Sequence, residues 1–158
     1  MDVEKNLISI LERKGINYER TTHKPVYTSE QASEVRGVPL DTGVKAMVLE
    51  RDESELILGL VPANYRIDLS TISNHESSEI KLADPDDVFK QTGCEIGSVP
   101  PFGHRNTMMT YLDPEVLEKE KVNFNAGKHD VSVQIDSKVL PACIEASGAR
   151  LKIIDIKE

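Results

Sequence analysis

The stretch VKAMVLERDESELILGLV, residues 44–61, contains two apolar runs that are separated by a short polar segment. The first run covers residues 44–51 and the second covers residues 55–61, and the polar residues 52–54 between them form a turn signal. This pattern predicts two strands joined as a hairpin. Apolar side chains fill successive positions of each run, so we expect both faces of the strands to be buried and the hairpin to lie centrally in a sheet.

Helical and strand patterns alternate irregularly on both sides of this hairpin. Helical spacing with capping or stop residues predicts short helices at residues 2–14, 28–37, 68–74, 84–92, 113–119 and 137–146. Thr28 and Gln31 form a capping-box pattern at the start of the second. Further strands are expected at residues 16–22, 107–112, 122–125, 131–135 and 150–156. This order of elements indicates an α+β fold, a mixed β-sheet or β-barrel flanked by short helices, and not a doubly wound nucleotide-binding fold.

Length and charge limit the classes of protein to which the chain can belong. With 158 residues, of which 39% are apolar and 29% charged, we expect one globular domain over residues 1–158. The net charge of −8 disfavours nonspecific nucleic-acid binding, so a nucleic-acid partner must meet a local patch or be delivered by another protein. No apolar run is long enough to cross a bilayer and the first residues lack the features of a signal peptide. We therefore expect a soluble, cytoplasmic protein without a membrane partner.

A lysine interrupts the first apolar run of the hairpin. The two-residue period of a strand places Lys45 on the same side as Met47 and Leu49. Its ammonium group must therefore either leave the core at the end of the strand, as a surface lysine does, or face a cavity. In the second case it would be placed to hold a phosphate or to polarise a carbonyl group.

A second unusual segment is the loop GSVPPFG at residues 97–103. Two adjacent prolines stiffen its backbone, while the other residues keep their N–H groups. Such a loop either presents fixed donors to a carbonyl or phosphate oxygen or forms a structural crossover. The sequence leaves both open. Ser98 lacks the Gly-x-Ser-x-Gly surroundings of a nucleophilic serine.

The histidines and cysteines give no sign of a cofactor site. The four histidines lack the spacing of zinc ligands, and the two cysteines lie too far apart for a CxxC site and are expected to be free thiols. Neither GxxxxGK[ST] nor GxGxxG is present. We therefore expect no metal and no cofactor. His129, beside Asp130 in a loop, is either an acid–base group or a solvated side chain.

Five segments occur in the order that is found in one family of proteins. They are residues 22–30 (THKPVYTSE), 43–48 (GVKAMV), 84–93 (DPDDVFKQTG), 97–103 (GSVPPFG) and 123–127 (NFNAG). Each is weak alone, but the ordered set is specific and spans about residues 20–140. The chain therefore resembles the YbaK family of aminoacyl-tRNA deacylases, whose domain is also inserted in prolyl-tRNA synthetases.

The resemblance implies a compact mixed β-barrel that acts on mischarged aminoacyl-tRNA, with alanyl- or cysteinyl-tRNA of the proline system as the expected substrate and a synthetase as a further partner. Lys45 matches the functional lysine of the family, residues 97–101 match its GxxxP substrate loop, and residues 127–129 lie where the family has its pocket wall. The residues expected to bind the substrate are His23, Thr28, Gly97, Ser98, Val99, Pro100, Pro101, Phe102, Gly103, Gly127 and His129.

The reaction implied is hydrolysis of an ester, which is activated enough to need no covalent nucleophile or metal. Orienting a water molecule or the neighbouring ribose hydroxyl can contribute about 7–11 kcal/mol, and backbone N–H groups of residues 97–99 would hold the oxyanion for about 3–4 kcal/mol. We expect Lys45 to act as an electrostatic clamp on the terminal phosphate or ribose and not as a base. The alternative is a non-catalytic module that binds an aminoacyl or nucleotide-like ligand in the same pocket.

Overall fold

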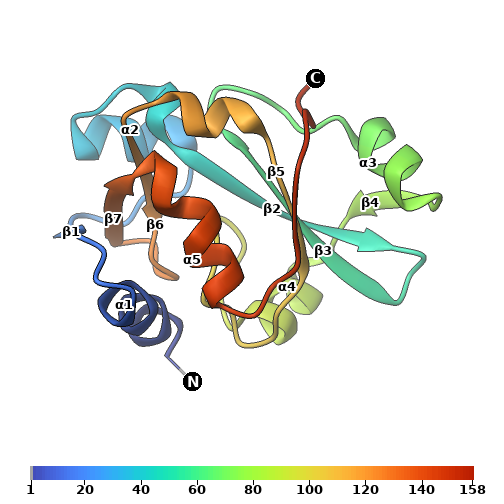
Figure 1. Ribbon diagram of the computed structural model, residues 1–158, viewed down its shortest axis with the longest axis horizontal. Coiled ribbons are helices and arrows are strands. Elements are labelled where there is room, and N and C mark those ends of the chain that lie inside the picture. Colours follow the sequence, from blue (N-terminus) through green and yellow to red (C-terminus); the bar gives the residue numbers. More distant parts are fainter. Residues whose placement is uncertain (1) are drawn as a thin grey trace.

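Two β-sheets with helices around them form the structure, which is a computed structural model that describes residues 2–158 (Figure 1). One sheet has three antiparallel strands in the order β1-β7-β6. The other has five strands in the order β4-β2-β3-β5-β8. The strands are β1 (Glu19–Thr22), β2 (Val44–Arg51), β3 (Glu55–Pro62), β4 (Ile80–Leu82), β5 (Met109–Leu112), β6 (Lys121–Asn125), β7 (Val131–Asp136) and β8 (Leu151–Ile153).

The α+β architecture with a mixed sheet is confirmed, but the described residues do not close into the barrel that the resemblance implied. Strand β3 pairs antiparallel with β2 and parallel with β5, so the five-stranded sheet is mixed. A single isolated bridge, between Gly43 and Asn123, links the start of β2 to β6. Because no continuous ladder follows that bridge, the two sheets remain separate layers that share a core.

The predicted hairpin is correct and lies at the centre of the five-stranded sheet. Val48 and Leu58 point into the core shared with the three-stranded sheet, whereas Leu49 and Ile57 point to a second apolar cluster on the opposite face. Helix α3 covers this second face through Ile72. Burial on both faces explains why apolar residues occupy successive positions of β2 and β3.

The helices lie around the two sheets (Figure 1). Helices α1 and α5 pack on the shared core, and Pro141 lies in the first turn of α5, where proline is tolerated. The predicted helix at residues 113–119 is a 3₁₀ segment, Pro114–Glu118. The α-helices are α1 (Val3–Arg13), α2 (Ser29–Arg36), α3 (Leu69–Glu76), α4 (Pro85–Thr92) and α5 (Leu140–Ala146), with further 3₁₀ segments at Leu40–Thr42 and Ser137–Val139.

Several strand ends differ from the predictions. Strand β4 was not predicted, because three residues at a sheet edge are too few to show a periodic pattern. The predicted strands 16–22, 107–112 and 150–156 are shorter in the structure. After β8, which ends at Ile153, the N–H of Ile156 donates to the carboxylate of Asp113 (3.0 Å), so the pairing with β5 does not continue to residue 156.

Asp113 joins the end of β5 to the C-terminal segment. Its carboxylate is fully buried and accepts hydrogen bonds from the N–H groups of Glu115 (2.9 Å) and Ile156 (3.0 Å), and Lys157 Nζ lies 3.4 Å away. Asp113→Ala would leave these donors unsatisfied, so we expect the free energy of unfolding to fall by about 3 kcal/mol. Urea denaturation would measure this change.

The matched control is Asp155→Ala, which removes an exposed carboxylate from the same Lys157. We expect little change in stability for this variant. Equal losses in the two variants would mean that the buried hydrogen bonds of Asp113 do not hold the C-terminal segment.

Candidate active site

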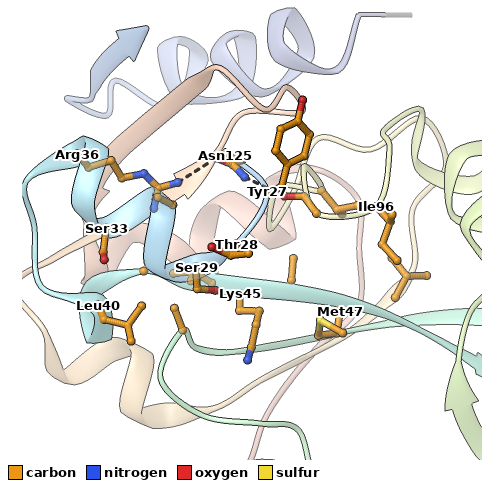
Figure 2. Close-up of a pocket in the computed structure, with 18 of the residues that line it drawn as sticks. Tyr27, Thr28, Ser29, Ser33, Arg36, Leu40, Lys45, Met47, Ile96 and Asn125 are labelled. Carbon is orange, nitrogen blue, oxygen red and sulfur yellow. Dashed lines mark hydrogen bonds between the residues drawn. The ribbon is translucent and has the colours of Figure 1, made fainter. Parts of the chain in front are cut away.

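A cavity of about 300 Å³ lies between α2, the first half of β2 and the loop that follows α4 (Figure 2). Its wall is polar along α2 and largely apolar along β2 and α4. Because it joins elements from distant parts of the sequence, no single motif defines it. Among its lining residues are Tyr27, Thr28, Ser29, Ser33, Arg36, Val44, Lys45, Ala46, Met47, Val48, Ala63, Leu82, Ala83, Val88, Ile96, Gly97, Val99 and Asn125.

Helix α2 supplies the polar wall, and its start is fixed by side-chain capping. The hydroxyl of Thr28 accepts from the N–H of Gln31 (3.1 Å), and the side-chain oxygen of Gln31 accepts from the N–H of Tyr27 (2.9 Å). The predicted capping box is therefore present, with Gln31 reaching one residue further back than the usual pattern. Ser33 and Arg36 follow at helical spacing and both line the cavity.

Lys45 extends from β2 into the cavity. Of the two positions that the sequence allowed for its ammonium group, at the surface or facing a cavity, the structure has the second. Figure 2 shows its ammonium group pointing away from the guanidinium group of Arg36. Lys45 forms no ion pair with a carboxylate of residues 2–158. Burial lowers the pKa of Lys45, the charge of Glu30 opposes this shift and the charge of Arg66 adds to it. The fold thus keeps a cation partly desolvated and without a direct counter-ion.

Arg36 is a second cation of the cavity, and the sequence did not reveal it. Its Nε donates to the hydroxyl of Ser132 (2.8 Å) and its Nη2 donates to the side-chain oxygen of Asn125 (3.0 Å), so both partners are neutral. Burial lowers the pKa of Arg36 to about 10. A basic residue in the last turn of a helix is ordinary, because it complements the helix dipole, and so the pattern gave no signal.

Asn125 connects Arg36 to the glycine-rich loop. Its Nδ2 donates to the carbonyl oxygen of Gly97 (2.9 Å) while its oxygen accepts from Arg36. Gly97 has a φ of +86°, which favours glycine, and lines the cavity together with Val99. The chain Arg36, Asn125, Gly97 therefore fixes the start of the loop relative to α2.

The N–H groups of the loop are not equally available. Ser98 donates both its N–H (3.0 Å) and its hydroxyl (2.8 Å) to the carbonyl oxygen of Glu95, which closes a tight turn. The expectation that Ser98 offers a backbone donor to a substrate is therefore wrong. Within residues 2–158, the N–H groups of Gly97 and Val99 have no acceptor, so these two donors remain free.

The second half of the loop has a structural role. Pro100 and Pro101 are buried and do not line the cavity, and Phe102 lies in the shared core, where its ring meets Phe124 edge to face at 5.8 Å. Gly103 has a φ of +91°, and a Cβ there would come within 3.1 Å of the α1 backbone. The four positions expected to bind substrate instead anchor the loop to the core and to α1.

His104 completes this anchor and makes the loop sensitive to acid. Its Nε2 lies 2.6 Å from the carbonyl oxygen of Pro100, and burial lowers the pKa of His104 to about 4. In the unfolded chain a histidine has a pKa near 6.5, so below that pH the unfolded state binds the proton first and the folded state loses stability. We expect His104 to account for about 2 kcal/mol of the stability lost between pH 7.5 and pH 5.0.

His104→Gln keeps a donor for Pro100 and removes the titrating group. Urea denaturation of both proteins at the two pH values would isolate the histidine, because other groups titrate alike in both. The same pH-dependent loss in the variant would contradict a neutral, buried His104.

His23 and His129 lie behind the cavity wall. The Nδ1 of His23 donates to the carbonyl oxygen of Lys24 (2.8 Å), so its Nε2 accepts from the hydroxyl of Ser132 (2.7 Å), the same oxygen that accepts from Arg36. His23 therefore orients a partner of Arg36 and does not line the cavity.

The ring of His129 packs on Tyr27 at 4.5 Å, and its two nitrogens lie near the carbonyl oxygen of Val26 (3.1 Å) and the carboxylate of Glu95 (3.4 Å). Gly127 faces Val3 of α1 and not the cavity. The residues 127–129 thus support the wall from outside. Of the expected substrate-binding residues, Thr28, Gly97 and Val99 line the cavity with Lys45.

Residues 23–142 match the model of a protein family described as the aminoacyl-tRNA editing domain. This range covers most of the chain and includes every residue that lines the cavity. The chain belongs to this family. The prediction that the protein is an aminoacyl-tRNA deacylase, and so an enzyme, is confirmed.

Relatives of this editing domain include stand-alone proteins of similar length. The multifunctional Ser/Thr-tRNA deacylase ProXp-y of Escherichia coli (strain K12) is 33% identical over 134 residues, which are 82% of this chain and 80% of the relative. The prolyl-tRNA editing protein ProX of Acetoanaerobium sticklandii is 25% identical over 99% of each chain. A crystal structure described as "a putative trans-editing enzyme for prolyl tRNA synthetase" superposes with a TM-score of 0.82 at 25% identity, covering 100% of this chain and 98% of the other.

Within residues 2–158, no helix has the length and apolar character needed to cross a bilayer. In the same range, no three histidine, cysteine, aspartate or glutamate side chains come together as a metal ion would require.

Proposed function

We propose that this editing domain hydrolyses the ester bond between a small amino acid and the terminal ribose of a mischarged tRNA, in the cavity between α2 and β2. The observation that carries the proposal is the pair of cations, Lys45 and Arg36, in a cavity whose lining, as far as the structure describes it, contains no carboxylate. Such a site favours ligands that are anionic or that become negative during reaction. The end of an aminoacyl-tRNA offers both, in its phosphate and in its ester carbonyl.

The positions of the two cations suggest different roles for them. Arg36 is tied through Asn125 to Gly97, next to the free N–H groups of Gly97 and Val99. This side of the cavity suits the carbonyl oxygen, which gains charge in the transition state. Lys45 lies apart from Arg36 (Figure 2) and suits the terminal phosphate or ribose. It would act as a clamp and leave proton transfer to other groups.

The cavity supports direct attack on the ester. The hydroxyls of Thr28, Ser29 and Ser33 line it, but neither histidine nor carboxylate does so among the described residues. A serine or threonine without a neighbouring base is a weak nucleophile. A positioned water molecule therefore adds to the carbonyl carbon and the bond from that carbon to the ribose oxygen breaks; the ribose oxygen takes up a proton from the water, and the amino acid leaves with a free carboxyl group.

The size and polarity of the cavity limit the amino acid. A volume of about 300 Å³ must also admit part of the terminal nucleotide, so the amino acid must be small. The resemblance favours alanyl- or cysteinyl-tRNA of the proline system, whereas the relative ProXp-y is named for serine and threonine. The Thr28 hydroxyl accepts from Gln31 and keeps its proton free, which would serve a polar side chain.

A panel of mischarged tRNAs tests the proposal. We expect the purified protein to release at least one of alanine, cysteine, serine and threonine from tRNA, and to leave isoleucyl- and phenylalanyl-tRNA intact. Saturable binding of the panel without release would instead select the non-catalytic binding module. Release of the large amino acids at equal rates would contradict a small cavity.

Delivery of the tRNA by a synthetase agrees with the charge of the chain. A net charge of −8 gives little nonspecific attraction for tRNA. We expect added prolyl-tRNA synthetase to lower the KM for mischarged tRNAPro and to leave kcat unchanged.

We expect chelators to leave turnover unchanged. Because aminoacyl-tRNA is used by ribosomes in the cytoplasm, we expect the protein to work there.

A further inference from the structure

The charges around the cavity conflict with the charge of the expected substrate. An amino acid attached as an ester keeps a free α-amino group, which is an ammonium ion at low pH and lies two bonds from the carbonyl carbon. A site that binds this ammonium would need an acidic side chain close to the carbonyl oxygen. Among the described residues that line the cavity none is acidic, whereas Arg36 and Lys45 are cations.

Two acidic residues of the segments around the cavity, Glu30 and Glu95, lie outside its lining. Glu30, which acts on the charge of Lys45 from α2, is exposed, and Arg66 adds a further positive charge from the segment after β3. Glu95 is largely exposed and contacts His129 behind the wall. These carboxylates can reduce the positive electrostatic potential of the cavity, but they lie outside its lining and do not bind an α-ammonium group inside it.

The groups that face Arg36 from the neighbouring strands are neutral. They are the side chains of Asn125 on β6 and Ser132 on β7, and the ring of His23 lies behind Ser132. Among the described lining residues, the side-chain groups that can accept from an α-ammonium are neutral hydroxyl and amide oxygens. None of these oxygens carries a full negative charge that could offset the positive charges of Lys45 and Arg36.

We propose that the cavity selects esters whose α-substituent is uncharged, so that it takes an aminoacyl ester with its α-amine unprotonated and also takes esters of α-hydroxy acids. This inference rests on the proposed function and names its substrate class. Like charges repel strongly in a partly desolvated site, so binding of the ammonium form is disfavoured. An α-amine with an ordinary pKa of about 7.7–8.0 is partly neutral at physiological pH, so the normal reaction is still possible.

In the hydrolysis of an α-hydroxy ester, the same bonds form and break as in the hydrolysis of an aminoacyl ester. Water adds through its oxygen to the carbonyl carbon, the bond from that carbon to the ribose oxygen breaks, and the ribose oxygen receives a proton. The products are the α-hydroxy acid and the tRNA with a free terminal hydroxyl. The editing domain would therefore also clear tRNA that carries a deaminated amino acid.

The experiment compares alanyl-tRNA with lactyl-tRNA, in which a hydroxyl of similar size replaces the α-amino group. Both kcat/KM values are measured at pH 6.0 and pH 8.5, each divided by the spontaneous hydrolysis rate of that ester in the same buffer. At pH 6.0 only about 1–2% of an ordinary α-amine is neutral. We expect lactyl-tRNA to be preferred by about 10-fold or more at pH 6.0, and the preference to shrink to within about 3-fold at pH 8.5.

Charge variants identify the source of the preference. Arg36→Gln removes one of the two cations, so we expect the preference at pH 6.0 to fall several-fold even though overall activity also falls. Lys152→Gln removes an exposed charge on β8, which is separated from β2 by the two strands β3 and β5, and is expected to keep the full preference.

The outcomes separate this inference from the function on which it rests. Turnover of neither ester, when the panel shows no other substrate, would overturn the proposed function. Turnover of alanyl-tRNA with equal or lower turnover of lactyl-tRNA at pH 6.0 would leave that function intact and overturn the selection of neutral α-substituents.

Discussion

Lys45→Met is expected to lower kcat/KM for deacylation by about 100-fold, which corresponds to about 2.7 kcal/mol of lost transition-state stabilisation. Lys45 is a cation of the cavity, has no ion-pair partner within residues 2–158 and would hold the phosphate or ribose end of the tRNA. Methionine keeps the length and flexibility of the side chain but loses the charge. Single-turnover deacylation of the preferred mischarged tRNA measures the effect.

The same variant should be as stable as the wild type or more stable. Burial lowers the pKa of Lys45, which means that the folded state disfavours the charged form relative to the unfolded chain. Replacing the ammonium by an apolar group removes this cost. Lower activity together with equal or higher stability is typical of a residue kept for function. Wild-type turnover in a folded Lys45→Met protein would remove Lys45 from the mechanism.

Arg36→Gln and Asn125→Ala are each expected to lower kcat by about 10- to 50-fold with a smaller change in KM. Arg36 holds Asn125 by a hydrogen bond of 3.0 Å, and Asn125 holds the carbonyl oxygen of Gly97 by one of 2.9 Å. Either change releases the loop whose free N–H groups we propose to hold the oxyanion. Arg36 thus acts as a positioning residue for the loop, in addition to its charge.

A double-mutant cycle measures this coupling. Because the two residues act on Gly97 through one chain of contacts, the double variant should be little worse than the worse single variant. Fully additive losses would contradict the chain. Arg13→Gln is the matched control, since Arg13 also lies in the last turn of a helix, α1, but is exposed and far from the cavity lining.

The centre of the fold followed from local pattern, and its edges did not. The apolar run of residues 44–61 is long enough to define both strands and their central position. Strand β4 and the ends of β5 and β8 depend on contacts between distant residues, such as Asp113 with the N–H of Ile156. A window of local sequence does not contain such contacts.

The site shows the same division. Lys45 was visible because a charge in an apolar strand is a local conflict, and Gly97 was visible because glycines and prolines mark an unusual backbone. Arg36 and Asn125 contribute only through contacts across about 90 residues of chain, which no local pattern reveals. Conversely, Phe102 and Gly103 share the unusual motif but serve the core, because a stiff loop needs an anchor as well as a functional end.

The most direct test of the central claim is where an aminoacyl ester binds. A stable mimic is adenosine 5′-phosphate with alanine joined to its 3′ position through an amide, and it can be titrated into ¹⁵N-labelled protein. We predict that the amide signals of Gly97 and Val99 and the Nε–H signal of Arg36 shift most. Shifts confined to another surface, with these three signals unchanged at saturation, would contradict catalysis in this cavity.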